Sequence, residues 1–248
     1  MQPAAEIIQR TVLCIPGNWK NRSELVTAIA ESNAGNYLFA GMVLMDLKTK
    51  AGFELEIYER DNRMKEAFGF AGRVNQVTDN FLSKIDEHSL VLYLSGETGS
   101  FEKAFDLANA ANALLNAGGT GVKVETTGKA FEKEQWMGLV AEEYPANLYA
   151  LYVLDSISDG LGTTYSCGMH NLGLKDVIVY QEDFQEAVNL IAAFGYYQIM
   201  ESPEINVNQT FGVAANSPIF EIQEEHKQPN KGDDFFENPY GMWLLQRK

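Results

Sequence analysis

Residues 52–60 read GFELEIYER, and this stretch decides the fold class. Phe53, Leu55 and Ile57 fall on one side of an extended chain, whereas Glu54, Glu56 and Tyr58 fall on the other. Strict alternation of this kind predicts a strand with one buried and one hydrated face, which is typical of an antiparallel sheet. The preceding TKAG (49–52) predicts a turn, and therefore a hairpin with the apolar run at 37–47.

Two further apolar runs flank this hairpin. RTVLCIPG (10–17) and SLVLYLSG (89–96) are each predicted to be buried strands. Asn21 is a predicted helix cap, because Glu24 follows it at the spacing of a capping box. Between residues 64 and 86 apolar residues recur at helical spacing, which predicts a further helix. The resulting order, β-α-β-β-α-β, predicts a ferredoxin-like N-terminal half.

The second half of the chain also combines predicted strands with a helix, which is long. Strands are expected at 148–157, 163–169 and 176–180, a helix at 181–200, and closing strands after it. YPAN (144–147) is the best candidate boundary, so we expect subdomains at 1–145 and 146–248, which could also pack as a single domain. The predicted class is α+β, with mixed or antiparallel sheets and helices packed on one face.

The charge balance restricts the possible partners. The chain of 248 residues has 34 Asp and Glu against 19 Lys and Arg, a net charge of −15. Nucleic acid and anionic membrane surfaces are excluded as partners because both require a basic footprint. A basic protein partner is electrostatically favoured, although acidity of this kind also simply maintains solubility.

The N-terminus MQPAAEIIQR has no basic region followed by a long apolar run, so no signal peptide is predicted. The longest nearly uncharged apolar run, YLFAGMVLM (37–45), is about half of the ~20 residues that a membrane helix needs. We therefore expect a cytoplasmic protein. The sequence makes no prediction of oligomeric state.

Cofactor and metal motifs are missing from the sequence. The only Gly-Lys pair, Gly128-Lys129, is followed by Ala130 and cannot complete a Walker loop, so no cofactor is predicted. His88, His170 and His226 lie far apart and no metal motif is present, so no metal site is predicted. Ser100, at the start of a helix that follows a strand and a turn, is a candidate anion-binding residue; the alternative is an ordinary capped helix.

The stretch TTYSCGMHNLGLKD (163–176) contains the candidate catalytic residues Cys167 and His170. A cysteine beside a histidine can act as a nucleophile with its base. On a regular strand, however, residues three apart point to opposite faces, so only a turn or bulge at Gly168 would let the two side chains meet. His170 and Asp176 are also candidate binding residues, and Asp176 is expected to tie down a turn at Gly173.

The segment TTYSCGMHNLGLKDVIVY (163–180), the helix after it and NQTFG (208–212) resemble an uncharacterised bacterial family, the domain of unknown function 4261. The positions that carry the resemblance are Gly168, Gly173, Leu174 and Asp176. LVLYLSGE (90–97) and GVKVETTGKAFEKEQW (121–136) are similar to the region that precedes that domain. The resemblance implies a bacterial protein and brings no known chemistry with it.

Two functional hypotheses follow from the sequence. The preferred one is a cytosolic interaction or binding module whose acidic surface recognises a basic partner. The alternative is a small hydrolase or transferase that uses Cys167 with His170, or carboxylates in a cleft between the two halves.

Overall fold

The computed structural model describes residues 7–248, which divide into two compact units. The N-terminal unit comprises residues 10–143, and the C-terminal unit comprises residues 144–248 with residues 7–9. Both units combine helices with mostly antiparallel sheets, so the α+β class is confirmed. None of the helices in residues 7–248 has both the length and the apolar character needed to cross a membrane.

The N-terminal unit contains seven strands and five helices among its described residues. In chain order these are β1 (Arg10–Gly17), α1 (Arg22–Ser32), β2 (Tyr37–Ala40), β3 (Val43–Asp46), β4 (Gly52–Glu59), α2 (Met64–Ala71), α3 (Asp79–Asp86), β5 (Leu90–Glu97), α4 (Phe101–Asn116), β6 (Gly121–Val124), β7 (Lys129–Glu132) and α5 (Lys133–Val140).

The strands of this unit form one sheet in the order β2-β3-β4-β5-β1-β6-β7. Every named pairing in it is antiparallel, including the full-length pairing of β1 with β5. The expected ferredoxin-like arrangement is therefore not what the structure has, because a split β-α-β unit needs parallel strands joined by crossover helices. Instead, β1 and β5 form a central pair, with β4, β3 and β2 next to β5 and with β6 and β7 next to β1.

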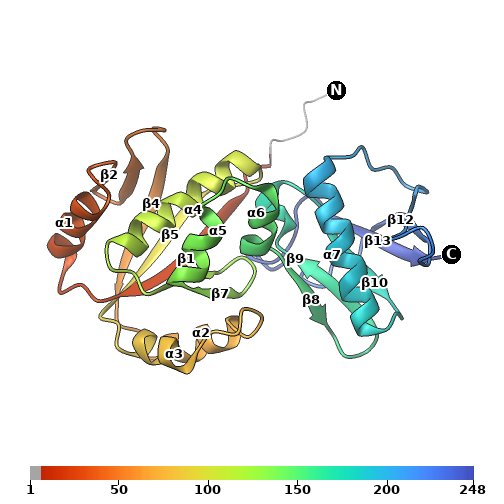
Figure 1. The fold of residues 1–248 in the computed structure, drawn as a ribbon, viewed down its shortest axis with the longest axis horizontal. Helices are drawn as coiled ribbons and strands as arrows, with labels where there is room; N and C mark the ends of the chain where they lie inside the picture. The colour runs from red at the N-terminus through yellow and green to blue at the C-terminus, as the bar shows by residue number, and fades with distance from the viewer. Residues whose placement is uncertain (1–6) are drawn as a thin grey trace. The chain divides into compact units, whose positions relative to one another are not determined.

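Helices cover both faces of the sheet, which corrects the expectation of a single helical layer. Cys14 and Val91 pack with Phe68 of α2 and Phe81 of α3 on one face. On the other face α4 packs against β1 and β5, and α5 packs against β6 and β7 (Figure 1). Strand β1 is buried on both faces for this reason, and its uninterrupted apolar sequence fits such a central position.

Two local predictions in this unit are wrong. The run at 37–47 is a short hairpin, β2 and β3, because Gly41 has a φ of 60° and turns the chain. The helical stretch at 64–86 consists of two helices separated at residues 72–78, where Gly72 caps α2 and the Thr78 hydroxyl caps α3 by accepting from Phe81 N at 3.2 Å. The predicted cap of α1 is confirmed, since Asn21 Oδ1 accepts from Glu24 N at 3.1 Å.

The described residues of the C-terminal unit form a second sheet, in the order β11-β12-β13-β10-β9-β8. Its elements in chain order are α6 (Pro145–Tyr152), β8 (Leu154–Ser158), β9 (Thr163–Cys167), the 3₁₀ helix η1 (Met169–Leu172), β10 (Asp176–Tyr180), α7 (Phe184–Glu201), β11 (Thr210–Phe211), β12 (Phe220–Glu225) and β13 (Met242–Arg247).

The core of the C-terminal unit lies between this sheet and α7 (Figure 1). Ile191 and Phe194 of α7 pack with Val177 and Val179 of β10 and with Trp243 of β13. The predicted long helix is thus confirmed, and Asp183 begins it by accepting from the backbone N–H groups of the first turn. The stretch 148–157 is wrong as a single strand, because its first half forms α6 with Pro145 in the first turn.

Candidate binding site

A pocket of about 710 Å³ opens where β4 begins, β5 ends and α4 starts. All of its lining residues belong to the N-terminal unit. They come from the start of β1, from the β2–β3 turn and the start of β3, from the start of β4 with the residue before it, from the end of β5, and from the cap and first two turns of α4. Its polar lining residues with ionisable side chains are Arg10, Glu54, Glu97, Glu102, Lys103 and Asp106.

Ser100 positions the helical side of this pocket. Its hydroxyl accepts from Lys103 N at 3.3 Å and so caps α4, while Ser100 itself lines the pocket. The start of α4 is thereby fixed, and Glu102 and Asp106, four residues apart, lie on one face of the helix. The structure assigns Ser100 to a helix cap beside two carboxylates, which is a poor environment for the anion considered from the sequence.

The two cations that line the pocket are both engaged in ion pairs. Arg10 lies 3.2 Å from Glu54, and Lys103 lies 3.0 Å from Glu97. Glu102 and Asp106 form no ion pair with any residue of the described chain. The pocket therefore has two carboxylates in excess of its cations, and these two stand on the same helix.

Asp106 is electrostatically unfavourable in its ionised form. Partial burial raises the pKa of its carboxyl above the usual range, and the neighbouring Glu102, Asp46 and Glu143 raise this pKa further. A cation bound beside Asp106 would relieve the repulsion and lower that pKa. No group of three or more Asp, Glu, His or Cys side chains within residues 7–248 is arranged to hold a metal ion.

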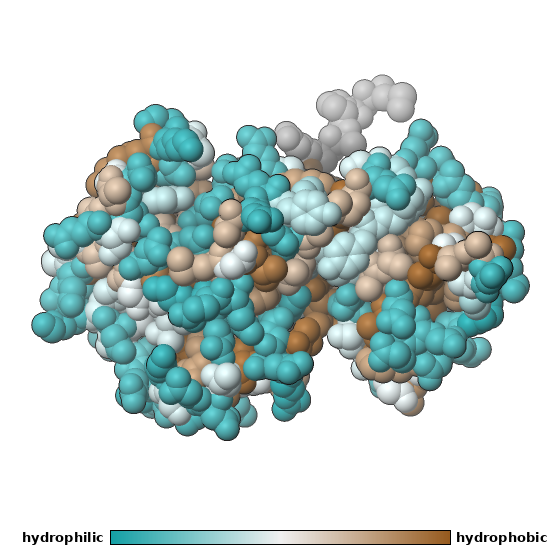
Figure 2. Space-filling view, viewed as in Figure 1, coloured by the Kyte–Doolittle hydropathy of each residue, from teal (hydrophilic) through white to brown (hydrophobic). Residues whose placement is uncertain are grey.

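The pocket also has apolar lining residues. Met42 and Val43 line it with 51% and 42% of their surface exposed, and Phe53 lies behind them in the sheet. Figure 2 shows hydrophobic residues on the β2–β3 hairpin within a mainly hydrophilic surface. A pocket lined by apolar side chains as well as carboxylates matches a lysine or arginine side chain, whose aliphatic stem and charged head need these two environments.

The second region singled out by the sequence, residues 163–176, forms a buried hydrogen-bond network around Asp176. This carboxylate accepts from the Ser166 hydroxyl at 2.9 Å, from Met169 N at 3.2 Å and from the Asn238 amide at 2.7 Å. The expectation that Asp176 ties down the turn agrees with these contacts. Its oxygens are occupied by structural donors and it is only 2% exposed, so it has no surface on which to bind a ligand.

His170 lies beside this network without joining it. Its Nδ1 is 3.8 Å from Asp176 Oδ2, its side chain is fully buried, and neither ring nitrogen forms a hydrogen bond within the described chain. Gly168, with a φ of 121°, ends the strand and starts the 3₁₀ helix η1 that carries His170. The chain thus turns where a Cys–His pair would need it to turn, but His170 forms no hydrogen bond to Cys167.

Cys167 lies in surroundings that favour its neutral thiol. Its thiol lies 3.7 Å from the Phe236 carbonyl oxygen, to which it donates. Burial raises its pKa well above the usual range, and Asp176 and Asp233 raise it further. A catalytic cysteine requires the opposite shift, because the thiolate is the reactive form.

Sequence reasoning missed Met42, Val43, Glu102 and Asp106. The spacing of the two carboxylates on an expected helix was visible, yet many carboxylate pairs in so acidic a chain share it. Only the fold shows that apolar residues of the β2–β3 hairpin line the same pocket as this pair. Comparison of the chain with protein-family models, with curated proteins and with solved structures gives no significant match.

Proposed function

We propose that this protein is an interaction module that binds a basic segment of a partner protein. The observation that carries the proposal is the pocket at the start of α4, where Glu102 and Asp106 have no cationic partner within the described chain and share the lining with the exposed apolar side chains of Met42 and Val43. A lysine or arginine side chain would offset the repulsion at Asp106 and cover the exposed apolar side chains.

The overall charge supports the same proposal. A net charge of −15 attracts basic partners over long range and disfavours nucleic acid and anionic lipid. We further propose that the protein acts in the bacterial cytoplasm and belongs to the domain of unknown function 4261, on the strength of Gly168, Gly173, Leu174 and Asp176. The alternative of a Cys167–His170 hydrolase finds less support, since burial favours the neutral thiol.

The test measures the binding of fluorescent peptides of equal length, one rich in lysine and arginine and one rich in glutamate. We expect only the basic peptide to bind, with an affinity that falls as salt rises. The double variant Glu102→Gln/Asp106→Asn should weaken binding about tenfold, because it removes the charged acceptors.

The matched control is Glu87→Gln/Glu134→Gln, which makes the same change of net charge at exposed positions outside the pocket. If both double variants weaken binding equally, the effect is one of overall charge and the pocket is not the site. Equal binding of the acidic peptide would contradict the proposal altogether.

A further inference from the structure

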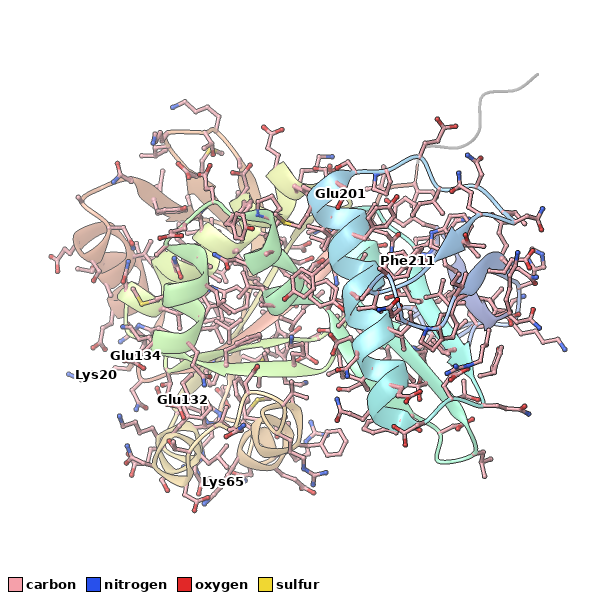
Figure 3. The ribbon with its side chains drawn as sticks, turned by 45° about the vertical axis from the view of Figure 1, so that its right-hand side comes forward. Lys20, Lys65, Glu132, Glu134, Glu201 and Phe211 are labelled. Carbon is pink, nitrogen blue, oxygen red and sulfur yellow. The ribbon has the colours of Figure 1, made fainter. Side chains whose placement is uncertain are left out.

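A second pocket, of about 460 Å³, lies in the C-terminal unit between α7, the loop that follows it and the strands β11 and β12. Tyr197, Glu204, Asn208, Gln209, Thr210 and Phe211 line it. Figure 3 shows Phe211 beside α7, with Glu201 at the end of the same helix. No residue of the pocket at α4 contributes to it, so an inference from this pocket does not rest on the function proposed above.

One wall of this pocket is aromatic and held firmly in place. The Phe211 ring lies 5.5 Å from the Tyr197 ring at 38°, and 4.9 Å from the Phe194 ring at 80°. Phe194 is fully buried in the core of the unit, whereas Tyr197 and Phe211 are only partly buried. The core thus supports two rings that keep part of their surface available to the pocket.

The loop that completes the pocket is also fixed. Asn208 N donates to the Ile222 carbonyl at 2.9 Å, and Ile222 N donates to the Gln209 carbonyl at 2.8 Å. Asn208 has a φ of 69°, a left-handed conformation that asparagine tolerates better than most residues. These bonds hold the loop against β12, so its side chains need little ordering when a ligand binds.

Several polar side chains of the pocket form no hydrogen bond within the described chain, whereas Gln209 Oε1 accepts from Asn206 N at 3.0 Å. Glu204 is exposed and forms no ion pair or hydrogen bond within the described chain, and the same holds for the side chains of Asn208 and Thr210. No lysine, arginine or histidine lines the pocket. An anion would therefore meet a carboxylate without a compensating charge, and a metal ion would find a single carboxylate.

We propose that this pocket binds the guanidinium group of an arginine side chain. The planar guanidinium stacks on aromatic rings and directs its N–H groups outward in its own plane. Tyr197 and Phe211 supply the rings, Glu204 supplies the charged acceptor, and Asn208 and Thr210 supply neutral oxygens. A lysine ammonium has no plane to stack and would use fewer of these groups.

The test uses the full chain and small probes. N-acetyl-arginine amide is titrated into ¹⁵N-labelled protein, with N-acetyl-lysine amide and N-acetyl-citrulline amide as probes of the same backbone. Citrulline keeps the planar shape and loses the charge. We expect the arginine probe to shift the amide resonances of residues 204–211, with a dissociation constant in the millimolar range that is typical of fragments, about 1 mM.

Variants locate the site. Glu204→Gln should weaken arginine binding about tenfold by removing the charge-assisted hydrogen bonds. Its matched control, Glu201→Gln, changes the same charge at the end of α7 outside the pocket lining and should bind as the parent protein does. Phe211→Leu should also weaken binding, and thermal unfolding shows whether this variant folds. Because Glu204 is exposed, Glu204→Gln does not disturb the core, and it tests the site even if Phe211→Leu fails to fold.

The proposal is overturned if arginine causes no shifts at 204–211, if citrulline or lysine binds as well as arginine, or if Glu204→Gln binds like Glu201→Gln. The variant Glu102→Gln/Asp106→Asn should leave these shifts unchanged. Loss of basic-peptide binding in that variant with retained arginine shifts separates the two pockets, so either proposal can fail without the other.

Discussion

Asn238 donates a side-chain N–H to Asp176 Oδ2 at 2.7 Å, and so joins the loop before β13 to the first residue of β10. The same amide also donates to the Leu174 carbonyl at 3.0 Å. Asp176 further holds the end of β9 through Ser166 and the start of η1 through Met169. One buried carboxylate therefore connects four segments of the C-terminal unit.

The first prediction concerns this carboxylate. Asp176→Ala should lower the free energy of unfolding by about 2–4 kcal/mol, because it leaves several buried donors without an acceptor. Urea denaturation at neutral pH measures the loss. Asp234→Ala, at an exposed position of the same unit, is the control and should change stability by no more than about 0.5 kcal/mol. A loss below about 1 kcal/mol at Asp176 would show that water replaces its contacts.

A second prediction compares two glycines inside helices. A Cβ on Gly195 of α7 would lie 2.5 Å from the Tyr149 ring, whereas a Cβ on Gly138 of α5 would meet nothing within 4 Å. Gly195→Ala should therefore destabilise the protein by about 1–3 kcal/mol through overpacking. Gly138→Ala should stabilise it by up to about 1 kcal/mol, because alanine is the better helix former. Thermal unfolding of the two variants gives the answer, and a stabilised Gly195→Ala would mean that Tyr149 moves aside freely.

A third prediction follows from the raised pKa of Asp106. Because the folded state raises this pKa, ionisation of Asp106 costs stability as pH rises through it. Asp106→Asn should consequently raise the melting temperature at pH 7, by no more than about 2 °C for a partly exposed group. The gain should shrink as pH falls toward the ordinary aspartate pKa of about 3.9, where the parent carboxyl is protonated too. A variant that is less stable than the parent at pH 7 would show that Asp106 has a stabilising partner.

The fourth prediction concerns the two cysteines. Burial raises the pKa of both Cys14 and Cys167, so iodoacetamide should label neither at neutral pH in the folded protein. Both should react after denaturation. Cys167→Ser leaves Cys14 as the only thiol, and mass spectrometry then assigns any label. Rapid labelling of Cys167 in the folded chain would revive the hydrolase hypothesis.

The sequence predicted the elements whose signals are local. The apolar strands β1 and β5, the alternating β4 and the caps of α1 and α4 all fall where their residues indicate. The run at 148–157 was ambiguous because a short apolar stretch fits a buried helix as well as a strand, and tertiary packing decided for α6. The strand neighbours could not be derived either, since antiparallel and split arrangements share one order of elements along the chain.

The candidate sites likewise combine contacts between residues close in sequence with contacts between residues far apart in sequence. His170 and Asp176 were close enough in sequence to be considered together, and the structure places them 3.8 Å apart. Asn238, however, lies 62 residues further along the chain than Asp176, and Met42 reaches the pocket of Asp106 from the β2–β3 hairpin. Contacts of such long range depend on the completed fold and leave no periodic trace in the sequence.

The central position of β13 has a consequence for synthesis on the ribosome. In the C-terminal unit β11 and β12 reach the rest of the described sheet only through β13, which pairs with β12 on one side and with β10 on the other. In the N-terminal sheet the strand that joins β1 to β4, β3 and β2 is β5 (Leu90–Glu97), which is made well before the last residues of that unit. The two parts of the C-terminal sheet, β11–β12 and β8–β9–β10, cannot be joined until residues 242–247 leave the exit tunnel. Until then the nascent chain has unpaired strand edges, to which chaperones can bind.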